Sequence, residues 1–206
     1  MGQYFEYNPN LKSNIKEIKY DLLGNKLIFN ADNGVFSKDR VDFGTNVLLN
    51  SLPDFRDKKH LVDVGCGYGV IGICLAKGYP NLAVDMVDIN QSAVDLTKEN
   101  IKRNRVSNAF VYESNLYEYY EKEKIDYKYD VLISNPPIRA GKKIVHDIAL
   151  LGYDLLADFG EAYFVIQKKQ GALSLLKAME DEYQKAEIIN KQNGYLILKG
   201  TKMITG

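Results

Sequence analysis

A glycine-rich loop behind an apolar run carries the most specific chemical signal in the sequence. Gly65, Gly67 and Gly69 alternate directly after Leu61–Val64, and an apolar segment with a helical pattern follows them. Glycine permits a tight turn and lets a ligand lie against bare backbone, while the next helix start offers unpaired N–H groups to an acidic ligand. This pattern predicts a nucleotide-type cofactor site.

Asp63 and Asp88 supply the acidic groups that such a site needs. Asp88 ends the next predicted strand, 23 residues past Gly65, where a carboxylate can accept hydrogen bonds from both ribose hydroxyls. A tight turn without a ligand would explain the glycines alone, but strand, helix and acidic residue together favour a cofactor. The segment Gly67 to Gly72 also fits the dinucleotide fingerprint, so the glycines alone leave NAD and S-adenosylmethionine open.

The chain lacks a convincing dehydrogenase pair. A short-chain dehydrogenase needs a Tyr and a Lys four residues apart on one helical turn, and the candidates are Tyr120/Lys124 and Tyr195/Lys199. The first pair lies in a charged run too close to the glycines, and the second lies on a predicted strand, where four residues span ~13 Å. This observation weighs against NAD.

A second candidate site follows the apolar run 130–134, where the sequence continues as Asn135-Pro136-Pro137. Two prolines fix the backbone and donate no hydrogen bonds, so Asn135 Oδ1 and the Pro136 carbonyl can act as rigid acceptors for one planar NH2 group. Such acceptors favour a pyramidal nitrogen whose lone pair can attack a methyl group, in a displacement governed by positioning. A plain strand-ending turn is the alternative. The position on the fourth strand after the glycine loop favours catalysis by these three residues, with S-adenosylmethionine as cofactor.

Apolar strand-like runs alternate with helical patterns along most of the chain. Strands are predicted over 60–64, 83–87, 109–112, 129–134, 161–167, 185–190 and 195–199. Alternation of this kind indicates an α/β fold with a mostly parallel sheet, helices on both faces and a ligand crevice beyond the carboxyl ends of the strands. The turn Gln192-Asn193-Gly194 predicts that the last two strands form an antiparallel hairpin.

Three helices can be placed from their apolar spacing and caps. One apolar face runs through Ile144, Ile148, Leu151 and Leu155, and another runs through Ala172, Leu175, Leu176 and Met179. Ser92, followed by Asp95, is predicted to start a helix that runs to about Asn104.

Residues 1–50 differ from the rest and are predicted to form a small N-terminal β-element, with the core over 51–206. Lys26–Phe29 and Gly34–Ser37 are β-like, and Asn33-Gly34 between them is a hairpin signal. With 206 residues, of which 46% are hydrophobic, the chain has the size of one compact domain.

The composition limits the partners. Lys and Arg total 27, as do Asp and Glu, so no global basic field attracts nucleic acid, and any RNA binding must use a local patch. We found no targeting or membrane segment and therefore expect a cytoplasmic protein without membrane partners. Cys66 and Cys74 are not spaced with the two histidines as metal ligands, so neither a metal nor a disulfide is expected.

Taken together, these motifs resemble the small methyltransferase family, close to the enzymes that methylate the exocyclic amine of guanine in small-subunit ribosomal RNA. The matching segments are 33–37, 41–45, the glycine loop with Asp88, Asn135-Pro136-Pro137, and 167–171. The resemblance implies a seven-stranded class I methyltransferase (Rossmann-like) sheet, preceded by an N-terminal element that helps close the cofactor site with Phe36, Asp42 and Thr45. Asn115 falls where the family usually has an acidic residue near the adenine amine, and its amide oxygen can accept the same hydrogen bond. The predicted cofactor-binding residues are Asp63, Gly65, Cys66, Gly67, Gly69, Asp88, Ile89, Asn115, Asn135, Phe36, Asp42 and Thr45.

The sequence indicates the methyl-transfer reaction more directly than it indicates the methyl acceptor. Related enzymes that act on bases or amides commonly carry an aromatic residue after Asn-Pro-Pro, whereas this chain has Ile138. Basic residues beyond two predicted strand ends can contact phosphates around a flipped-out nucleotide, although solvated lysines are equally common there. The predicted substrate-binding residues are Ile138, Arg139, Lys142, Lys143, Lys168 and Lys169. Guanine N2 in rRNA is the leading acceptor; the alternatives are a protein glutamine amide, an adenine amine, or a catalytically inactive cofactor-binding assembly module.

Overall fold

The computed structural model describes residues 15–32 and 40–203. Its strands are β1 (Lys16–Leu22), β2 (Asn25–Ala31), β3 (His60–Val64), β4 (Ala83–Asp88), β5 (Ala109–Glu113), β6 (Tyr129–Ser134), β7 (Leu156–Gln167), β8 (Lys185–Gln192) and β9 (Tyr195–Thr201). Its helices are α1 (Phe43–Leu49), α2 (Val70–Gly78), α3 (Gln91–Arg103), α4 (Glu118–Lys122), α5 (Lys142–Tyr153) and α6 (Ala172–Glu182), with the short 3-10 turns η1 (Ile138–Ala140) and η2 (Lys168–Gln170).

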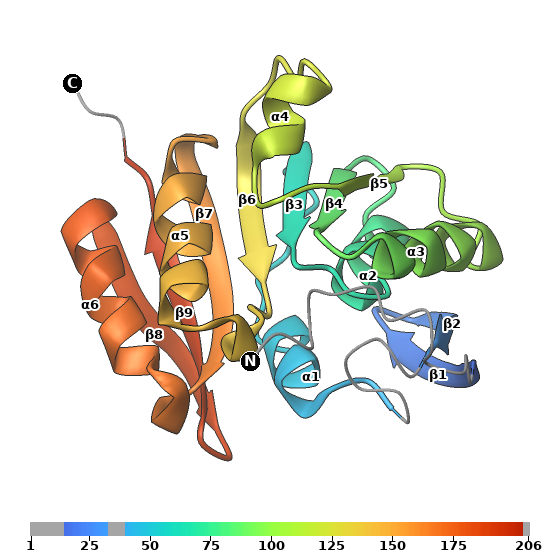
Figure 1. The fold of residues 1–206 in the computed structure, drawn as a ribbon, viewed down its shortest axis with the longest axis horizontal. Coiled ribbons are helices and arrows are strands. Elements are labelled where there is room, and N and C mark those ends of the chain that lie inside the picture. Colours follow the sequence, from blue (N-terminus) through green and yellow to red (C-terminus); the bar gives the residue numbers. More distant parts are fainter. Residues whose placement is uncertain (1–14, 33–39, 204–206) are drawn as a thin grey trace.

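Within the described residues, seven strands form one sheet in the order β5-β4-β3-β6-β7-β9-β8 (Figure 1). Strands β5, β4, β3, β6 and β7 pair in parallel, so their carboxyl ends share one edge. Strand β9 runs antiparallel between β7 and β8. The predicted seven-stranded α/β sheet and the predicted antiparallel C-terminal hairpin are confirmed.

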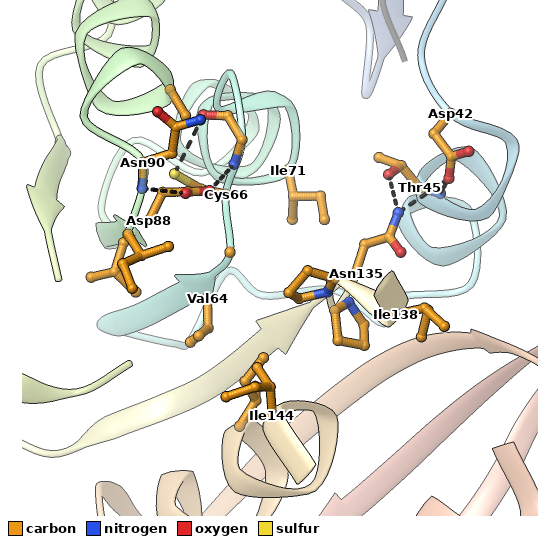
Figure 2. A pocket seen from close by; sticks show the side chains of 18 of the residues that line it. Asp42, Thr45, Val64, Cys66, Ile71, Asp88, Asn90, Asn135, Ile138 and Ile144 are labelled. Carbon is orange, nitrogen blue, oxygen red and sulfur yellow. Dashed lines mark hydrogen bonds between the residues drawn. The ribbon is translucent and has the colours of Figure 1, made fainter. Parts of the chain in front are cut away.

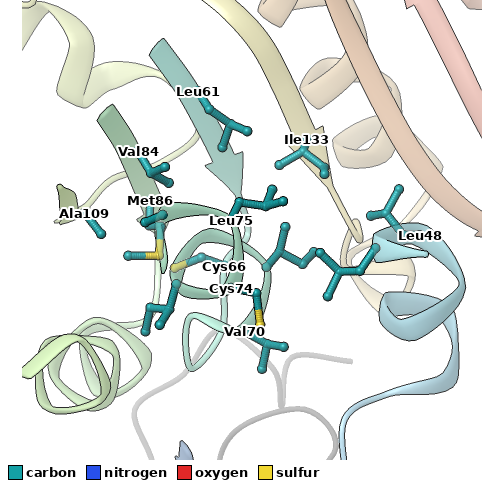
Figure 3. Packing of buried hydrophobic residues seen from close by; sticks show 14 of the residues in the cluster. Leu48, Leu61, Cys66, Val70, Cys74, Leu75, Val84, Met86, Ala109 and Ile133 are labelled. Atoms are coloured by element: carbon teal, nitrogen blue, oxygen red, sulfur yellow. The ribbon is translucent and has the colours of Figure 1, made fainter. Parts of the chain in front are cut away.

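Apolar residues cover both faces of this sheet. Leu61 of β3 belongs to a cluster that includes Leu48 of α1 and Cys74 of α2 (Figure 3). Val62 points the other way, into a cluster that includes Ile148 of α5 and Leu175 of α6. Because strand side chains alternate between faces, this doubly covered sheet explains why the strands are nearly continuous apolar runs in the sequence.

The N-terminal hairpin of β1 and β2 lies beside α2 and α3 (Figure 1). Its turn is at Leu23 and Gly24, which have φ values of 50° and 73°. Lys26–Phe29 therefore lies in a strand as predicted, but the partner strand β1 was not predicted. The predicted run 34–37 and the turn at Asn33-Gly34 lie outside the described residues.

Three local predictions need correction. Helix α3 is capped by Asn90, whose side chain accepts a hydrogen bond from Ser92 N at 3.0 Å, so Ser92 lies inside the helix. Helix α5 ends before Leu155, and its Leu151 is exposed, because the buried face runs through Val145, Ile148, Ala149 and Gly152. Strand β7 begins five residues earlier than predicted, at Leu156, and pairs with β6 through a register shift.

No helix among residues 15–32 and 40–203 combines the length and apolarity that crossing a membrane requires.

Two buried asparagines attach the hairpin to the core: Asn100 of α3 and Asn104, the residue that caps the C-terminal end of this helix. Asn100 accepts a hydrogen bond from Asn30 N at 2.7 Å, and its Nδ2 donates to Asn30 O and to Tyr68 O, both at 2.9 Å. Asn104 pairs in the same way with the backbone of Ile28. One side-chain amide thus joins the edge of β2 to the glycine-rich loop.

We expect Asn100→Ala to lower the free energy of unfolding by about 3 kcal/mol, because it leaves one buried and two partly buried backbone groups without this partner. Urea unfolding measures this change, with the exposed Asn81→Ala as a control that should stay within about 0.5 kcal/mol of the wild type. Equal losses in the two variants would mean that the hydrogen bonds of Asn100 do not stabilise the attachment of the hairpin.

Candidate active site

A pocket of about 750 Å³ opens at the carboxyl edge of the parallel strands, a volume typical of sites for small molecules. Asp88 and Asn90 line one side of it, and Asp42, Thr45 and Asn135 line the other (Figure 2). The glycine-rich loop after β3 lies between them. The two motifs that the sequence singled out therefore share one cavity.

The glycine loop combines positive φ angles with backbone hydrogen bonds to β4. Gly65, Gly67 and Gly69 have φ values of 73°, 59° and 87°, a region that other residues rarely adopt. The N–H groups of Gly65 and Cys66 both donate to Val87 O, at 2.8 and 3.0 Å. These hydrogen bonds fix the loop to the end of β4, and the backbone of Gly65 and Gly67 lines the pocket.

Asp88 is anchored by the protein itself. Its Oδ2 accepts from Gly67 N and its Oδ1 from Asn90 N, both at 2.9 Å. A carboxylate has about four lone-pair sites, so both oxygens can accept again. Burial raises the pKa of Asp88, against the lowering effect of these backbone hydrogen bonds. The group is placed to accept two hydroxyls of a ligand in the pocket.

Asp63 lies beneath the loop and is completely buried. Its Oδ2 accepts from Gly72 N at 2.9 Å, but its Oδ1 has no partner within the described residues. Burial raises the pKa of Asp63 to about 7, helped by the nearby charge of Asp88. Neither Asp63 nor Gly69 lines the pocket, so the unsatisfied Asp63 Oδ1 is a buried acceptor beneath the loop and not an atom that the pocket exposes.

Ile89 and Asn115 line the same pocket as Asp88. Ile89 is 42% exposed and lines the pocket, where a planar ring can cover it. Asn115 donates from Nδ2 to Glu118 Oε1 at 2.9 Å, which leaves its Oδ1 as an acceptor. Burial raises the pKa of the Cys66 thiol well above its ordinary value, so this residue contributes packing and not a thiolate.

Asn135 is held in one orientation by the start of α1. Its Nδ2 donates to Thr45 Oγ1 at 2.9 Å and to Asp42 Oδ2 at 3.1 Å (Figure 2). Because a carboxylate only accepts, the Asn135 amide must turn its NH2 group toward Asp42 and leave its oxygen for another partner. Asp42 also caps α1 through Thr45 N at 3.1 Å. Both Asp42 and Thr45 line the pocket, and the side-chain hydrogen bonds described for them involve Asn135 and the α1 backbone.

The remaining predicted residues divide by position. Pro136, Pro137, Ile138 and Arg139 line the pocket with Asn135. Four exposed lysines lie beyond the same sheet edge but outside this pocket: Lys142, Lys143, Lys168 and Lys169. Lys143 pairs with Asp147 at 2.5 Å, and Lys168 and Lys169 line a second hollow with Leu173 and Asn193. Phe36 lies outside the described residues.

Several lining residues were not predicted to be functional. Among them are Gln167, Gln170, Tyr195, Ile144 and Ile148. Gln167 had a usable signal, since it ends the strand next to the one that carries Asn135, and parallel strands end at one edge. Tyr195 had none, because its strand runs in the opposite direction and meets this edge at its start.

A family model and two related sequences match most of the chain. The family model of the methyltransferase small domain matches residues 26–199. YbxB of Bacillus subtilis (strain 168), which is named as uncharacterized, is 37% identical over 200 residues, which cover 97% of this chain and 98% of YbxB. Ribosomal RNA small subunit methyltransferase C of Vibrio parahaemolyticus is 34% identical over 176 residues, covering 82% of this chain and 48% of that protein.

A solved structure agrees with the fold. The T. thermophilus 16S rRNA N2 G1207 methyltransferase (RsmC), in complex with AdoMet and guanosine, matches with a TM-score of 0.79 at 21% identity, over 94% of this chain and 51% of that one. The chain thus spans nearly all of YbxB but about half of these rRNA methyltransferases.

The buried Asp63 should set part of the pH dependence of stability in the absence of ligand. Its folded-state pKa of about 7 lies above the ordinary value of 3.8. Between those values only the unfolded chain releases the proton, so the free energy of unfolding falls as the pH rises and levels off above about pH 7. Between pH 5 and pH 8 the free energy of unfolding of the wild type should therefore fall by about 2–3 kcal/mol more than that of Asp63→Asn. Urea unfolding at both pH values measures this, and parallel pH dependences would contradict it.

Proposed function

The chain belongs to the methyltransferase small domain family, and from that premise we propose that it methylates the N2 amine of a guanine in small-subunit rRNA with S-adenosylmethionine. The observation that carries the proposal is the Asn135 amide. Its NH2 group is tied to Asp42 and Thr45, so its oxygen is available to an amine in the pocket that the glycine loop also lines. The name of the T. thermophilus structure gives a guanine N2 position for that protein.

The cofactor half of the pocket has groups that match each part of S-adenosylmethionine. Asp88 would accept the ribose hydroxyls, Ile89 and Asn115 would hold the adenine, and the glycine loop with Asp63 would hold the methionine end. Asp63 does not line the pocket, and its buried Oδ1 has no partner among the described residues. Its carboxylate would favour a cationic amine beside the loop, because a nearby positive charge lowers the cost of a buried carboxylate. When bound, S-adenosylmethionine supplies a methyl carbon on a positively charged sulfur, so that an amine can displace a neutral thioether.

The residues of the acceptor half position the amine. Asn135 Oδ1 and the Pro136 carbonyl would accept its two hydrogens and direct its lone pair toward the cofactor side of the pocket. Ser134 Oγ donates to Val64 O at 2.7 Å, which ties the acceptor strand to the strand that enters the glycine loop. Positioning of this kind accounts for much of the acceleration of a displacement reaction. The methylated nitrogen then loses a proton to solvent and needs no strong base.

RNA is the proposed partner, either as small-subunit rRNA or as a pre-ribosomal particle, with the cytoplasm as the proposed location. Lys142, Lys168 and Lys169 are exposed beside the pocket, and Arg139 lines it. Adjacent parallel strands place these cations at one edge, where they can contact phosphates around a flipped-out guanine. We also propose that residues 1–50 help to close the cofactor site over the core at 51–206.

Replacing Lys142, Lys143, Lys168 and Lys169 together by Glu should weaken RNA binding and leave cofactor affinity near that of the wild type. The logarithm of the RNA affinity should fall less steeply with the logarithm of salt concentration, because fewer phosphates are contacted. Fluorescence anisotropy with labelled rRNA fragments measures both slopes. Equal slopes would point to a protein or small-molecule acceptor.

Variants at Asn135 distinguish an effect on methyl transfer from an effect on cofactor binding. Asn135→Ala should reduce the single-turnover methylation rate by ~100- to 1000-fold while cofactor affinity stays within a few fold. Asn135→Asp should methylate no faster than Asn135→Ala, because it places a second carboxylate next to that of Asp42. Adding Asp42→Asn to that variant should recover part of the rate, since it restores a donor opposite the new carboxylate and asparagine caps a helix as well as aspartate.

Nucleoside mass spectrometry tests the same assignment in cells. Cells that lack the protein should lose N2-methylguanosine at one rRNA position, and wild-type protein but not Asn135→Ala should restore it. Wild-type rates in Asn135→Ala would mean that the Asn-Pro-Pro segment is only a turn, and unchanged rRNA nucleosides would rule out this substrate.

A further inference from the structure

We propose that Gln167 and Tyr195 read the ring edge of the acceptor base, with Gln167 Oε1 accepting from the ring N–H that adjoins the reactive amine in guanine. This inference rests on the proposed function and names the residues that select its base.

Both side chains face the same wall of the pocket as Asn135. Gln167 ends β7 and pairs directly with Tyr195 at the start of β9. Val165, two residues before Gln167, belongs to the apolar cluster on the α1 and α2 face, so strand alternation puts Gln167 on that face too. Asn135 reaches the same face through its hydrogen bonds to α1. All three line one pocket.

Helix α1 fixes this wall from behind. Phe43 and Tyr195 pack with ring centroids 5.5 Å apart. A Cβ atom at Gly44 would lie 2.7 Å from Tyr195 Cε1, so the ring occupies the space that the glycine leaves. The next residue, Thr45, holds Asn135. Three consecutive residues of α1 therefore position the tyrosine and the amide relative to each other.

The hydrogen bonds already made determine what the pair can offer a base. Gln167 Nε2 donates to the Tyr195 hydroxyl at 2.6 Å. No other hydrogen bond of either side chain occurs within the described part of the chain. Gln167 Oε1 is left as an acceptor, and the Tyr195 hydroxyl, having accepted, is left as a donor.

This order of groups matches guanine. Next to its N2 amine guanine carries N1–H, a donor, and then O6, an acceptor. Adenine and cytosine carry a ring nitrogen acceptor next to the amine, which would face Gln167 Oε1 with no proton between them. A site built to bond a polar group rejects an analogue that lacks it, because its own polar atoms stay unpaired. The pair also lies opposite Ile138 and Ile144, which belong to the apolar cluster on the other face, so this wall supplies the aromatic and polar contacts that Ile138 does not.

The test compares guanine with 2-aminopurine at the methylated position of a short rRNA-derived oligonucleotide. 2-Aminopurine keeps the 2-amine but lacks N1–H and O6. We expect the wild type to prefer guanine by at least ~100-fold in kcat/KM. Gln167→Ala should reduce that preference to within ~10-fold by slowing guanine alone. Gln167→Glu keeps an acceptor for N1–H but also accepts a hydrogen bond from the Tyr195 hydroxyl, so it should retain more of the preference than Gln167→Ala without reaching that of the wild type. Tyr195→Phe, which keeps the ring packing, should also lose part of the preference.

A matched control exists elsewhere on the surface. Tyr153 and Gln184 form a second tyrosine–glutamine pair, with Gln184 Nε2 donating to the Tyr153 hydroxyl at 2.8 Å, and neither lines the pocket. Gln184→Ala should leave the base preference unchanged. If the wild type methylates guanine and Gln167→Ala keeps the full preference, the assignment is wrong while the proposed function stands. A wild type that binds S-adenosylmethionine but methylates neither base would overturn both.

Discussion

Parallel pairing of β3 with β4 and β6 is the constraint on which the whole site depends. Parallel strands end at the same edge, so the glycine loop, Asp88 and Asn135 meet although they are separated by up to about seventy residues in the chain. A one-residue slip of β6 would turn Asn135 away from α1 and toward the opposite face. The apolar clusters on both faces prevent such a slip, because Ile133 and Leu132 would exchange environments.

Helix α1 contacts both Asn135 and Tyr195 and so links the two sides of the acceptor site. It has only seven residues, too few to be stable alone, and its stability comes from packing on β7 and β9. Asp42 serves both as its cap and as the partner of Asn135. The same carboxylate therefore stabilises a helix end and orients an amide, so the loss of either hydrogen bond should disturb the other.

The sequence predicted most of what is local and little of what is distant. The strands, the glycine loop and the C-terminal hairpin have local signals, because apolar runs, glycines and an Asn-Gly turn act through their own backbone. Strand β1 was missed because it is mostly charged and polar, and it lies beside β2, whose edge is held by Asn100 and Asn104 some seventy residues away. The contact of Asn135 with Asp42 spans 93 residues, and that of Gln167 with Tyr195 spans 28. Residue spacing alone carries no signal for either.

The two carboxylates beneath the glycine loop show how binding and stability oppose each other. Asp88 is satisfied by two backbone N–H groups, so it is in place before any ligand arrives. Asp63 accepts from one backbone N–H group, and its second oxygen is buried with no partner in the part of the chain that the structure describes. Burial without full satisfaction destabilises the folded chain at neutral pH, and a cationic ligand in the adjoining pocket would offset part of that cost by placing a positive charge near the carboxylate. A ligand that binds only the folded state stabilises it, so a carboxylate that costs stability in the empty pocket strengthens binding in the filled one.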